Sequence, residues 1–402
     1  MTNLAHHLRL TPVGVTIDPL THRVDERLLA ITMFVGALGS GGAERQAVAL
    51  ALELHRRGHR VSLLSLRDGP MHSLLQRAGI PVEVVRSTRG ASLASLPSVT
   101  RVLRHQLPDV VYAFLDTPSL LALAARPFAC DARVVLGVRS SQYQRSAREV
   151  QRRSALRLTR YAAQFADLLI ANSTAGLTDF QQHVVRPPRG IVIPNGVDTA
   201  RFFPDVIGRA RVRNEWNVGG DDIVIGHVAA FDPNKDHETL FAAFARAAHV
   251  NRRLTLVCVG EGTAERIAVL RDRLAARGLT ERVRLVNSRD DVAAMYSAFD
   301  LFALTSIREG FPTVVAEAMV CGVPAVVTDT GASSAIVGGL GEVVPVGDVN
   351  ALASALLRMA EARSPALSAR CRLHVLAEFT LSRAADRTVS AFLGLVASAS
   401  GS

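Results

Sequence analysis

The sequence almost entirely lacks lysine. Of its 46 basic residues, Lys235 is the one lysine and all the others are arginine. Since arginine serves wherever only a positive surface is needed, a single ammonium group indicates a chemical requirement, such as contact with a phosphate oxygen. The alternative is that an arginine-rich coding bias spared one surface lysine by chance, and the count alone does not separate the two interpretations.

Cysteines and long apolar runs are also scarce. Four cysteines lie far apart, with no Cys-x-x-Cys pair and no histidine at ligand spacing, so neither disulfides nor a zinc site is expected at Cys130, Cys258, Cys321 and Cys371. The apolar run 28–38 is too short to span a bilayer and lacks the flanks of a signal peptide. We therefore expect a soluble, cytoplasmic protein.

The formal net charge of +10 calls for an anionic partner. Nucleic acid is not expected, because the arginines are scattered and no aromatic stacking motif lies among them. A predicted helix over 142–165 carries one arginine stripe, made of Arg145, Arg148 and Arg152. The simpler interpretation is a solvated surface helix, and the alternative is peripheral contact with the inner, anionic face of the cytoplasmic membrane.

At 402 residues the chain predicts more than one domain. After a loose tail (1–26), short apolar runs alternate with helix-length segments. This pattern predicts two doubly wound, Rossmann-like α/β domains (27–198 and 223–380) that face each other across a cleft. A polar connection (199–222) joins them, and a last helix (381–402) is expected to pack back on the first domain. The predicted strands are 28–35, 60–65, 82–85, 110–114, 134–138, 168–171, 191–193, 223–228, 254–259, 283–286, 301–304, 325–328 and 342–345.

The segment after the predicted strand 301–304 carries the clearest chemistry. A helix is expected to begin there with Pro312 in its first turn, and its free backbone amides would face an anion. Glu309 precedes this helix start, and Glu317 lies one turn into the helix, where carboxylates suit neutral hydroxyl donors. The alternative is a capped helix with two solvated acids. The amides in question belong to Gly310, Phe311, Thr313 and Val314.

Glu309 and Glu317, with seven residues between them, resemble the E-x7-E signature of the retaining glycosyltransferases of family 4, which have GT-B architecture. Four more segments resemble this family: the glycine-rich 41–45, the interdomain 193–198, the basic loop 231–237 and the turn 331–337. The resemblance implies transfer of a sugar from a nucleoside diphosphate sugar to a glycan or lipid-linked acceptor, in surface polysaccharide or glycolipid biosynthesis.

The resemblance also implies a role for each matching residue. The chain has no Asp-x-Asp pair, so we expect neither a metal nor another cofactor, and the diphosphate charge falls on Lys235 and the helix amides. Glu309 would hold the hydroxyls of the donor sugar and Glu317 those of the ribose. Gly41 and Gly42 would approach the donor closely, and Asn287 would contact the base.

The sequence departs from the family pattern in three places. Ala230 stands where an arginine is usual, with Arg308 as the nearest substitute in sequence. The turn after the glutamate motif lacks a Gly-Gly pair and a later glutamate, and Tyr112 stands where a histidine is usual. A nucleotide-sugar-binding protein without transferase activity is therefore one alternative, and a GT-B epimerase is another. Use of NAD is disfavoured, because the glycine-rich loop is not Gly-x-Gly-x-x-Gly and no acid follows the second strand.

Overall fold

The computed structural model describes most of the chain, namely residues 27–39, 41–85, 93–114, 116–129, 131–139, 158, 161–184 and 186–400. Several predictions lie outside these residues: the loose tail 1–26, Cys130, and the arginine stripe formed by Arg145, Arg148 and Arg152. At the end of the predicted helix 142–165, Ala163–Phe165 forms a 3₁₀ turn, η2.

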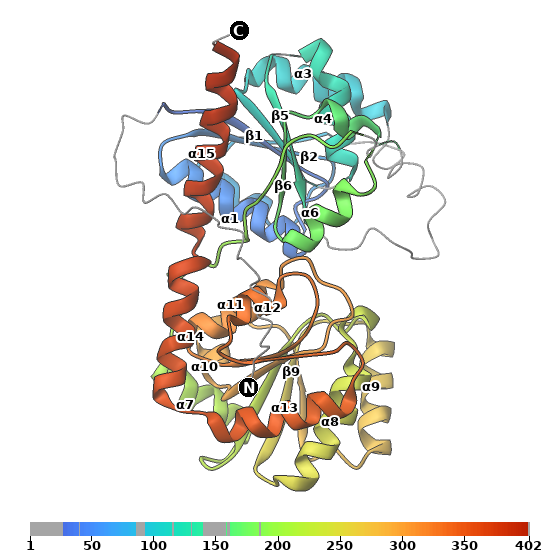
Figure 1. Cartoon of the computed structure of the whole chain (residues 1–402), viewed down its shortest axis with the longest axis vertical. Helices are drawn as coiled ribbons and strands as arrows, with labels where there is room; N and C mark the ends of the chain where they lie inside the picture. The colour runs from blue at the N-terminus through green and yellow to red at the C-terminus, as the bar shows by residue number, and fades with distance from the viewer. Residues whose placement is uncertain are drawn as a thin grey trace, which may run out of the picture.

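The first half of the described chain forms one parallel sheet of seven strands, in the upper lobe of Figure 1. The order is β3-β2-β1-β4-β5-β6-β7, so the strand order switches between β1 and β4. Both of these strands are buried along their whole length, as expected for a parallel sheet covered on both faces. The strands are Ala30–Val35 (β1), Arg60–Ser65 (β2), Val82–Val84 (β3), Val110–Phe114 (β4), Arg133–Val138 (β5), Leu168–Ala171 (β6) and Gly190–Val192 (β7).

Residues 223–344 of the described chain supply a second parallel sheet, of six strands, in the lower lobe. The order β10-β9-β8-β11-β12-β13 places the corresponding switch between β8 and β11. The strands are Ile223–Val228 (β8), Leu254–Val259 (β9), Val283–Val286 (β10), Leu301–Leu304 (β11), Ala325–Thr328 (β12) and Glu342–Val344 (β13).

Helices cover both sheets and bury their apolar sides against them. In the first domain they are Gly42–Arg56 (α1), His72–Arg77 (α2), Leu96–Gln106 (α3), Asp116–Ala129 (α4) and Thr174–Gln181 (α6). In the second they are Val206–Glu215 (α7), His237–Val250 (α8), Ala264–Ala276 (α9), Val292–Ser297 (α10), Thr313–Val320 (α11), Ser333–Val337 (α12), Val349–Ala362 (α13) and Pro365–Glu378 (α14). The last helix is Leu381–Ser400 (α15).

The predicted fold class is confirmed by these two Rossmann-like sheets. Each of the thirteen described strands begins and ends within two residues of its predicted bounds. Three cysteines, Cys258, Cys321 and Cys371, are free and buried, as predicted.

The polar stretch 199–222 is more than the connection that the sequence predicted, because it contains α7. Asp205 caps this helix by accepting a hydrogen bond from Gly208 N at 2.8 Å. Arg209 and Arg213 then bond to the carboxylate of Asp300, at 2.6 and 3.0 Å. A helix whose apolar pattern is weak is therefore anchored by ion pairs to a residue far along the chain.

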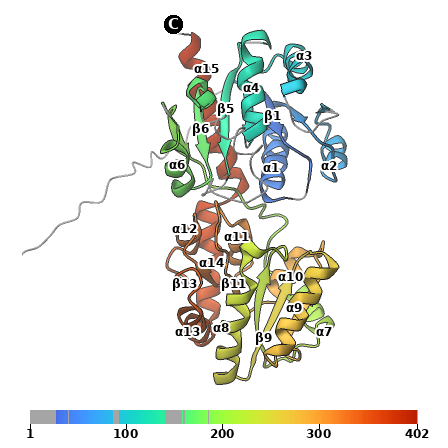
Figure 2. The same ribbon diagram turned by 90° about the vertical axis from the view of Figure 1, so that its right-hand side faces the viewer.

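Two chain segments cross between the domains side by side. Val197 N donates to Phe379 O at 2.7 Å, and Leu381 N donates to Val197 O at 2.9 Å. Beyond this crossing, α15 runs from the lower lobe along the upper one, as both Figure 1 and Figure 2 show. Ala385, Val389 and Phe392 of α15 belong to the core of the first domain, so the last helix ties the two domains together.

Gly226, in the middle of β8, is a sensitive point of the second domain's core. A Cβ atom there would lie 2.2 Å from Cδ2 of Phe299, whose ring stacks on Trp216 with centroids 5.7 Å apart. Because both rings are buried, Gly226→Ala should lower the free energy of unfolding by about 1–3 kcal/mol. Urea denaturation measures this loss. Gly220→Ala is the matched control, since nothing lies within 4 Å of its added Cβ, and equal losses in the two variants would contradict the prediction.

Candidate active site

A cavity of about 920 Å³ lies where the loops of both domains meet. Its lining includes residues that follow β1, β5 and β6 of the first sheet and β8 and β11 of the second. These loops leave the carboxyl ends of parallel strands, and three of the strands (β1, β8 and β11) lie beside the points where the strand order switches. This is the part of a doubly wound sheet where ligands bind.

Nine of the ten candidate site residues line this one cavity. They are Gly41, Gly42, Lys235, Glu309, Gly310, Phe311, Thr313, Val314 and Glu317. The tenth, Asn287, is exposed after the end of β10 and is not part of the lining. The cavity thus brings together predicted site residues that lie more than 270 positions apart in the sequence. The individual roles of these residues stay predictions.

Lys235 forms an ion pair with Glu309, the glutamate expected to hold the donor sugar. Its Nζ donates to Glu309 Oε1 at 2.6 Å, and the two side chains are 23% and 14% exposed. The Lys235 loop is a short 3₁₀ turn (Pro233–Lys235, η3) held by Asp232 and Asn234: Asp232 caps the turn, and Asn234 Nδ2 donates to Arg308 O at 2.9 Å. The loops after β8 and β11 are therefore fastened together at the position of the ammonium group.

The helix α11 begins at Thr313, at the residues where the sequence placed its start. Gly331, with φ of 56°, packs so closely that a Cβ there would lie 2.3 Å from Gly310 O. Ala332 N also donates to Gly310 O at 2.9 Å. The ring of Phe311 is buried against Phe379 with centroids 5.5 Å apart, so only its backbone is available to a ligand.

Glu317 is held by Tyr296, which the sequence did not indicate. Tyr296 Oη donates to Glu317 Oε2 at 2.6 Å. Burial raises the pKa of Glu317 above its usual value, although the hydrogen bond from Tyr296 and the charges of Arg45 and Arg201 oppose this shift. A fixed carboxylate facing a cavity can accept hydrogen bonds from a pair of hydroxyl groups.

Besides Lys235, the positive charge of the cavity does not come from Arg308, the substitute that the sequence suggested. Arg308 is absent from the lining, and Ala230 lines the cavity without contributing a charge. Four arginines do line it: Arg45, Arg56, Arg139 and Arg201. Arg139, Asn172 and Asn195 were missed, although a polar residue directly after a parallel strand, as at Arg139 and Asn172, was a usable signal.

Tyr112, the residue in place of the usual histidine, belongs to the core and not to the cavity. It is fully buried in β4, its ring lies 4.4 Å from that of Phe114, and its Oη accepts a hydrogen bond from Arg139 Nη2 at 2.6 Å. Burial raises the pKa of Tyr112, although the charge and hydrogen bond of Arg139 oppose this. Tyr112 thus acts on the cavity only by holding Arg139.

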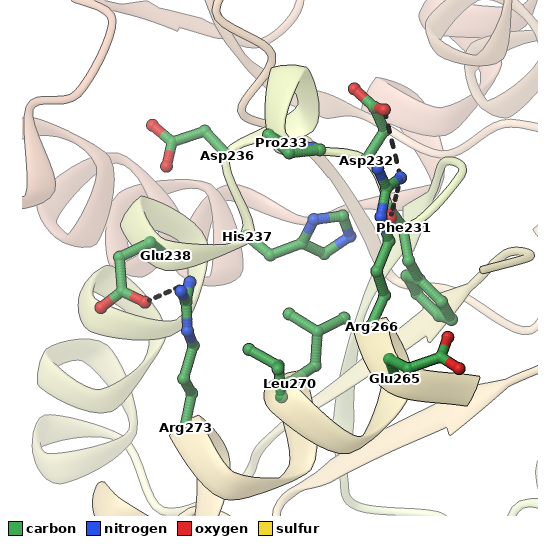
Figure 3. A pocket seen from close by; sticks show the side chains of 11 residues that line it. Phe231, Asp232, Pro233, Asp236, His237, Glu238, Glu265, Arg266, Leu270 and Arg273 are labelled. Atoms are coloured by element: carbon green, nitrogen blue, oxygen red, sulfur yellow. Dashed lines mark hydrogen bonds and ion pairs between the residues drawn. The ribbon is translucent and has the colours of Figure 1, made fainter. Parts of the chain in front are cut away.

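A smaller cavity, of about 330 Å³, shares the Lys235 loop (Figure 3). It lies between the segment 231–238 and α9. Its two arginines are paired, since Arg266 bonds to Asp232 at 3.3 Å and Arg273 bonds to Glu238 at 3.0 Å. With its cations neutralised, this cavity offers no anion site comparable to the first.

The imidazole of His237 borders the smaller cavity and packs on the ring of His227, with centroids 4.9 Å apart. Burial lowers the pKa of His227 to about 3, with the charge of His237 as a second cause, and burial also lowers the pKa of His237 to about 4. Both rings are therefore neutral near pH 7. Their Nε2 atoms have no hydrogen-bond partner among the described residues, and we assign the pair a structural role.

Because of this histidine pair, the free energy of unfolding should decrease as the pH is lowered. Unfolded histidines gain protons below a pKa of 6.5, whereas the folded ones stay neutral until pH approaches 4 and 3. Each histidine should therefore cost about 2 kcal/mol of unfolding free energy between pH 7.5 and 5.0. His227→Asn, whose amide can still donate to Ala303 O, should remove about half of this histidine-linked loss in urea denaturation. The exposed His105→Asn is the control, and an unchanged pH slope in the His227 variant would contradict the assignment.

Within the described ranges, no group of three or more His, Cys, Asp or Glu side chains is placed to hold a metal ion. Likewise, none of the helices in that part of the chain is both long and apolar enough to cross a membrane.

Two family models match the sequence. The model described as Glycosyltransferase Family 4 matches residues 40–201, and the model described as Glycosyl transferases group 1 matches residues 222–362. The chain is 24% identical over 309 residues to the putative glycosyltransferase EpsF of Bacillus subtilis (strain 168). This match covers 74% of this chain and 78% of EpsF.

A second relative comes from Campylobacter jejuni. It is the N-acetylgalactosamine-N,N'-diacetylbacillosaminyl-diphospho-undecaprenol 4-alpha-N-acetylgalactosaminyltransferase, 27% identical over 321 residues, or 74% of this chain and 80% of the relative. Among solved structures, HepE of Anabaena in complex with UDP superposes with a TM-score of 0.80 at 24% identity. This match covers 91% of this chain and 100% of HepE, and it shows a shared fold.

Proposed function

Because this chain belongs to the family 4 glycosyltransferases of GT-B architecture, we propose that it transfers a sugar, with retention and without a metal, from a nucleoside diphosphate sugar to a lipid-linked or glycan acceptor. The observation that carries the proposal is the convergence of Lys235, the start of α11 and the two glutamates in one interdomain cavity. Convergence of a cation, free amides and carboxylates suits a ligand that carries both phosphates and hydroxyls.

The diphosphate would lie at the start of α11, beside Lys235. The backbone N–H groups there are donors, the helix dipole adds positive potential, and the ammonium group supplies a full charge. These groups would stabilise the negative charge that develops on the leaving diphosphate as its bond to the sugar breaks. This arrangement supports the proposed metal independence, because the protein itself would supply the positive potential.

The ion pair between Lys235 and Glu309 would open when the donor binds. A diphosphate oxygen competes for the Lys235 ammonium group, and the freed Glu309 carboxylate can then accept hydroxyl hydrogen bonds from the sugar. Glu317, fixed by Tyr296, would hold the ribose hydroxyls. Retention would require the acceptor hydroxyl to attack on the face from which the diphosphate leaves.

The relatives support particular substrates. HepE was solved in complex with UDP, and the name of the Campylobacter relative specifies a diphospho-undecaprenol acceptor. We therefore propose a UDP-sugar donor and a lipid-linked acceptor, in the assembly of a surface polysaccharide or glycolipid. Such an acceptor would bring the enzyme to the inner face of the cytoplasmic membrane, where the net charge of +10 favours anionic lipid.

Donor screening followed by a turnover assay tests this function. Thermal shift with a panel of nucleoside diphosphate sugars identifies the donor, and release of the nucleoside diphosphate is then followed with and without a polyprenyl diphosphate-linked sugar. We expect acceptor-dependent release that EDTA does not reduce, and a product whose anomeric proton shows retention by NMR. Inhibition by EDTA would contradict metal independence.

The competing function is nucleotide-sugar binding without transfer, and the uncharged Ala230 in the cavity lining favours it. Tight donor binding without release, under every acceptor condition, would establish this alternative. Salt-sensitive sedimentation with vesicles of anionic lipid tests the membrane contact separately, and its absence would remove only that part of the proposal.

A further inference from the structure

The loop that carries Lys235 brings only one cation to the cavity. Ala230, earlier in the same loop, is exposed and lines the cavity, but its methyl group cannot balance charge. The ammonium group of Lys235 already bonds to Glu309. A leaving nucleoside diphosphate carries more than one negative charge, so under the proposed function a second cation is needed from elsewhere.

Of the four arginines in the lining, one is paired with a carboxylate and two act on Glu317 through their charge alone. Arg56 bonds to both carboxylate oxygens of Glu53, at 2.9 and 2.8 Å. The charges of Arg45 and Arg201 act on Glu317, the glutamate proposed for the ribose. Arg139, like Arg45 and Arg201, has no carboxylate partner among the residues that the structure describes, but it alone of these three has its guanidinium group fixed by hydrogen bonds there.

Among the described residues, the groups that hold Arg139 are all uncharged. Its Nη1 donates to Asn195 Oδ1 at 2.8 Å and its Nη2 donates to Tyr112 Oη at 2.6 Å. The guanidinium carbon lies 4.8 Å from the centroid of the Phe114 ring. The Nε atom is buried and has no partner in the described structure. A fixed guanidinium group with an unused donor and no counter-ion is suited to bind an anionic ligand.

Arg139 also lies beside the proposed diphosphate site. Asn195, which accepts from its guanidinium, donates through Nδ2 to Thr313 Oγ1 at 3.4 Å, and Thr313 is the first residue of α11. A Cβ on Gly310 would lie 2.7 Å from Arg139 O and 3.0 Å from Asn172 Oδ1. Asn172 Oδ1 is another buried atom without a partner in the described structure. The first domain thus presents a cation and an open acceptor at the start of α11.

We propose that Arg139 is the second cation for the donor diphosphate and replaces, from the opposite domain, the arginine absent at position 230. This inference rests on the proposed function. Its planar fork would bind phosphate oxygens opposite Lys235, so the diphosphate would be clamped between the two domains. Donor binding and the closed arrangement of the domains would then depend on each other.

The test compares the binding of a nucleoside diphosphate with the binding of its parent nucleoside. UDP and uridine are used first, and if the donor screen selects another base, the corresponding diphosphate and nucleoside are used as well. Calorimetry of Arg139→Met should show roughly 10- to 100-fold weaker binding of the diphosphate. Binding of the nucleoside should stay within about 2-fold, because the affected contact is to phosphate. Arg139→Lys should fall between the two. Arg77→Met, in the exposed α2, is the matched control and should bind as the wild type does.

Each other outcome of this comparison has a defined meaning. Equal losses for nucleoside and diphosphate would show a structural role for Arg139, and a change confined to the KM of the acceptor would place it at the acceptor. Either result, like unchanged binding, overturns the inference. If the wild type itself binds no nucleoside diphosphate, the proposed function fails instead.

Restoring the missing arginine provides a second, independent test. Ala230→Arg added to Arg139→Met should recover most of the lost affinity for the nucleoside diphosphate, because it puts a cation back beside the same phosphates. In the wild-type background the same substitution should improve binding much less. An equal gain in both backgrounds would show that the two positions do not share a ligand and would overturn the inference.

Discussion

Lys235→Ala is expected to abolish transfer while leaving the fold intact. The ammonium group bonds to Glu309, just before the start of α11 where the diphosphate would bind, and it lies at the end of a short, capped turn that fixes its position. Removing one preorganised donor from a developing anion typically reduces kcat by about 10²- to 10³-fold. The loss should therefore appear in kcat, measured as acceptor-dependent release of the nucleoside diphosphate.

The fold should survive, because the ion pair lost with Lys235 is partly exposed and such pairs contribute about 1 kcal/mol or less. The midpoint of urea denaturation checks this directly. Lys235→Arg provides the specific control, since it keeps the charge but replaces a compact ammonium group with a broad fork. We expect it to restore only a small part of the activity. Near-normal turnover in Lys235→Ala would return this lysine to the alternative of a surface residue spared by chance.

The strands, and the convergence of the loops that follow them, could both be predicted from the pattern of short apolar runs. Short β-branched runs form buried parallel strands, and the carboxyl ends of such strands meet at one edge of a sheet. The glycine-rich segment, the Lys235 loop and the glutamate motif each follow such a strand. Their convergence in one cavity could therefore be expected before any contact was known.

Contacts between residues that are distant in the sequence could not be predicted. The helix α7 depends on Asp300, about 90 positions further along the chain, so its own polar pattern was uninformative. Arg308 seemed the natural substitute at position 230 because it is close in sequence to Glu309. Arg139, whose backbone carbonyl packs beside Gly310 from the other domain, lines the cavity, and Arg308 does not. The pairing of Lys235 with Glu309 likewise became visible only in three dimensions.

Glu309→Gln is expected to separate transfer from binding of the leaving group. This carboxylate accepts a hydrogen bond from the Lys235 ammonium group at 2.6 Å, so it would compete with a diphosphate for the same cation. An amide competes less well. Affinity for the nucleoside diphosphate alone should stay the same or rise, by up to about 5-fold for an ion pair contributing about 1 kcal/mol.

The same substitution should reduce transfer by about 10²- to 10³-fold. Glu309 would no longer place a full negative charge against the sugar hydroxyls and the positive charge that develops at the anomeric carbon. Calorimetry with the nucleoside diphosphate and with its sugar, beside kcat for transfer, measures both effects in one variant. The preference for the intact donor over the free diphosphate should shrink.

A gain in diphosphate affinity together with a loss of transfer would distinguish a direct role of Glu309 at the donor sugar from a structural role. If Glu309 only positioned Lys235, its loss would weaken diphosphate binding and transfer together. Combining Glu309→Gln with Lys235→Ala decides between these readings. The gain in diphosphate affinity should vanish in the double variant, because no ammonium group remains to be released, and a gain that persisted would show that the Lys235–Glu309 pair does not govern access of the donor.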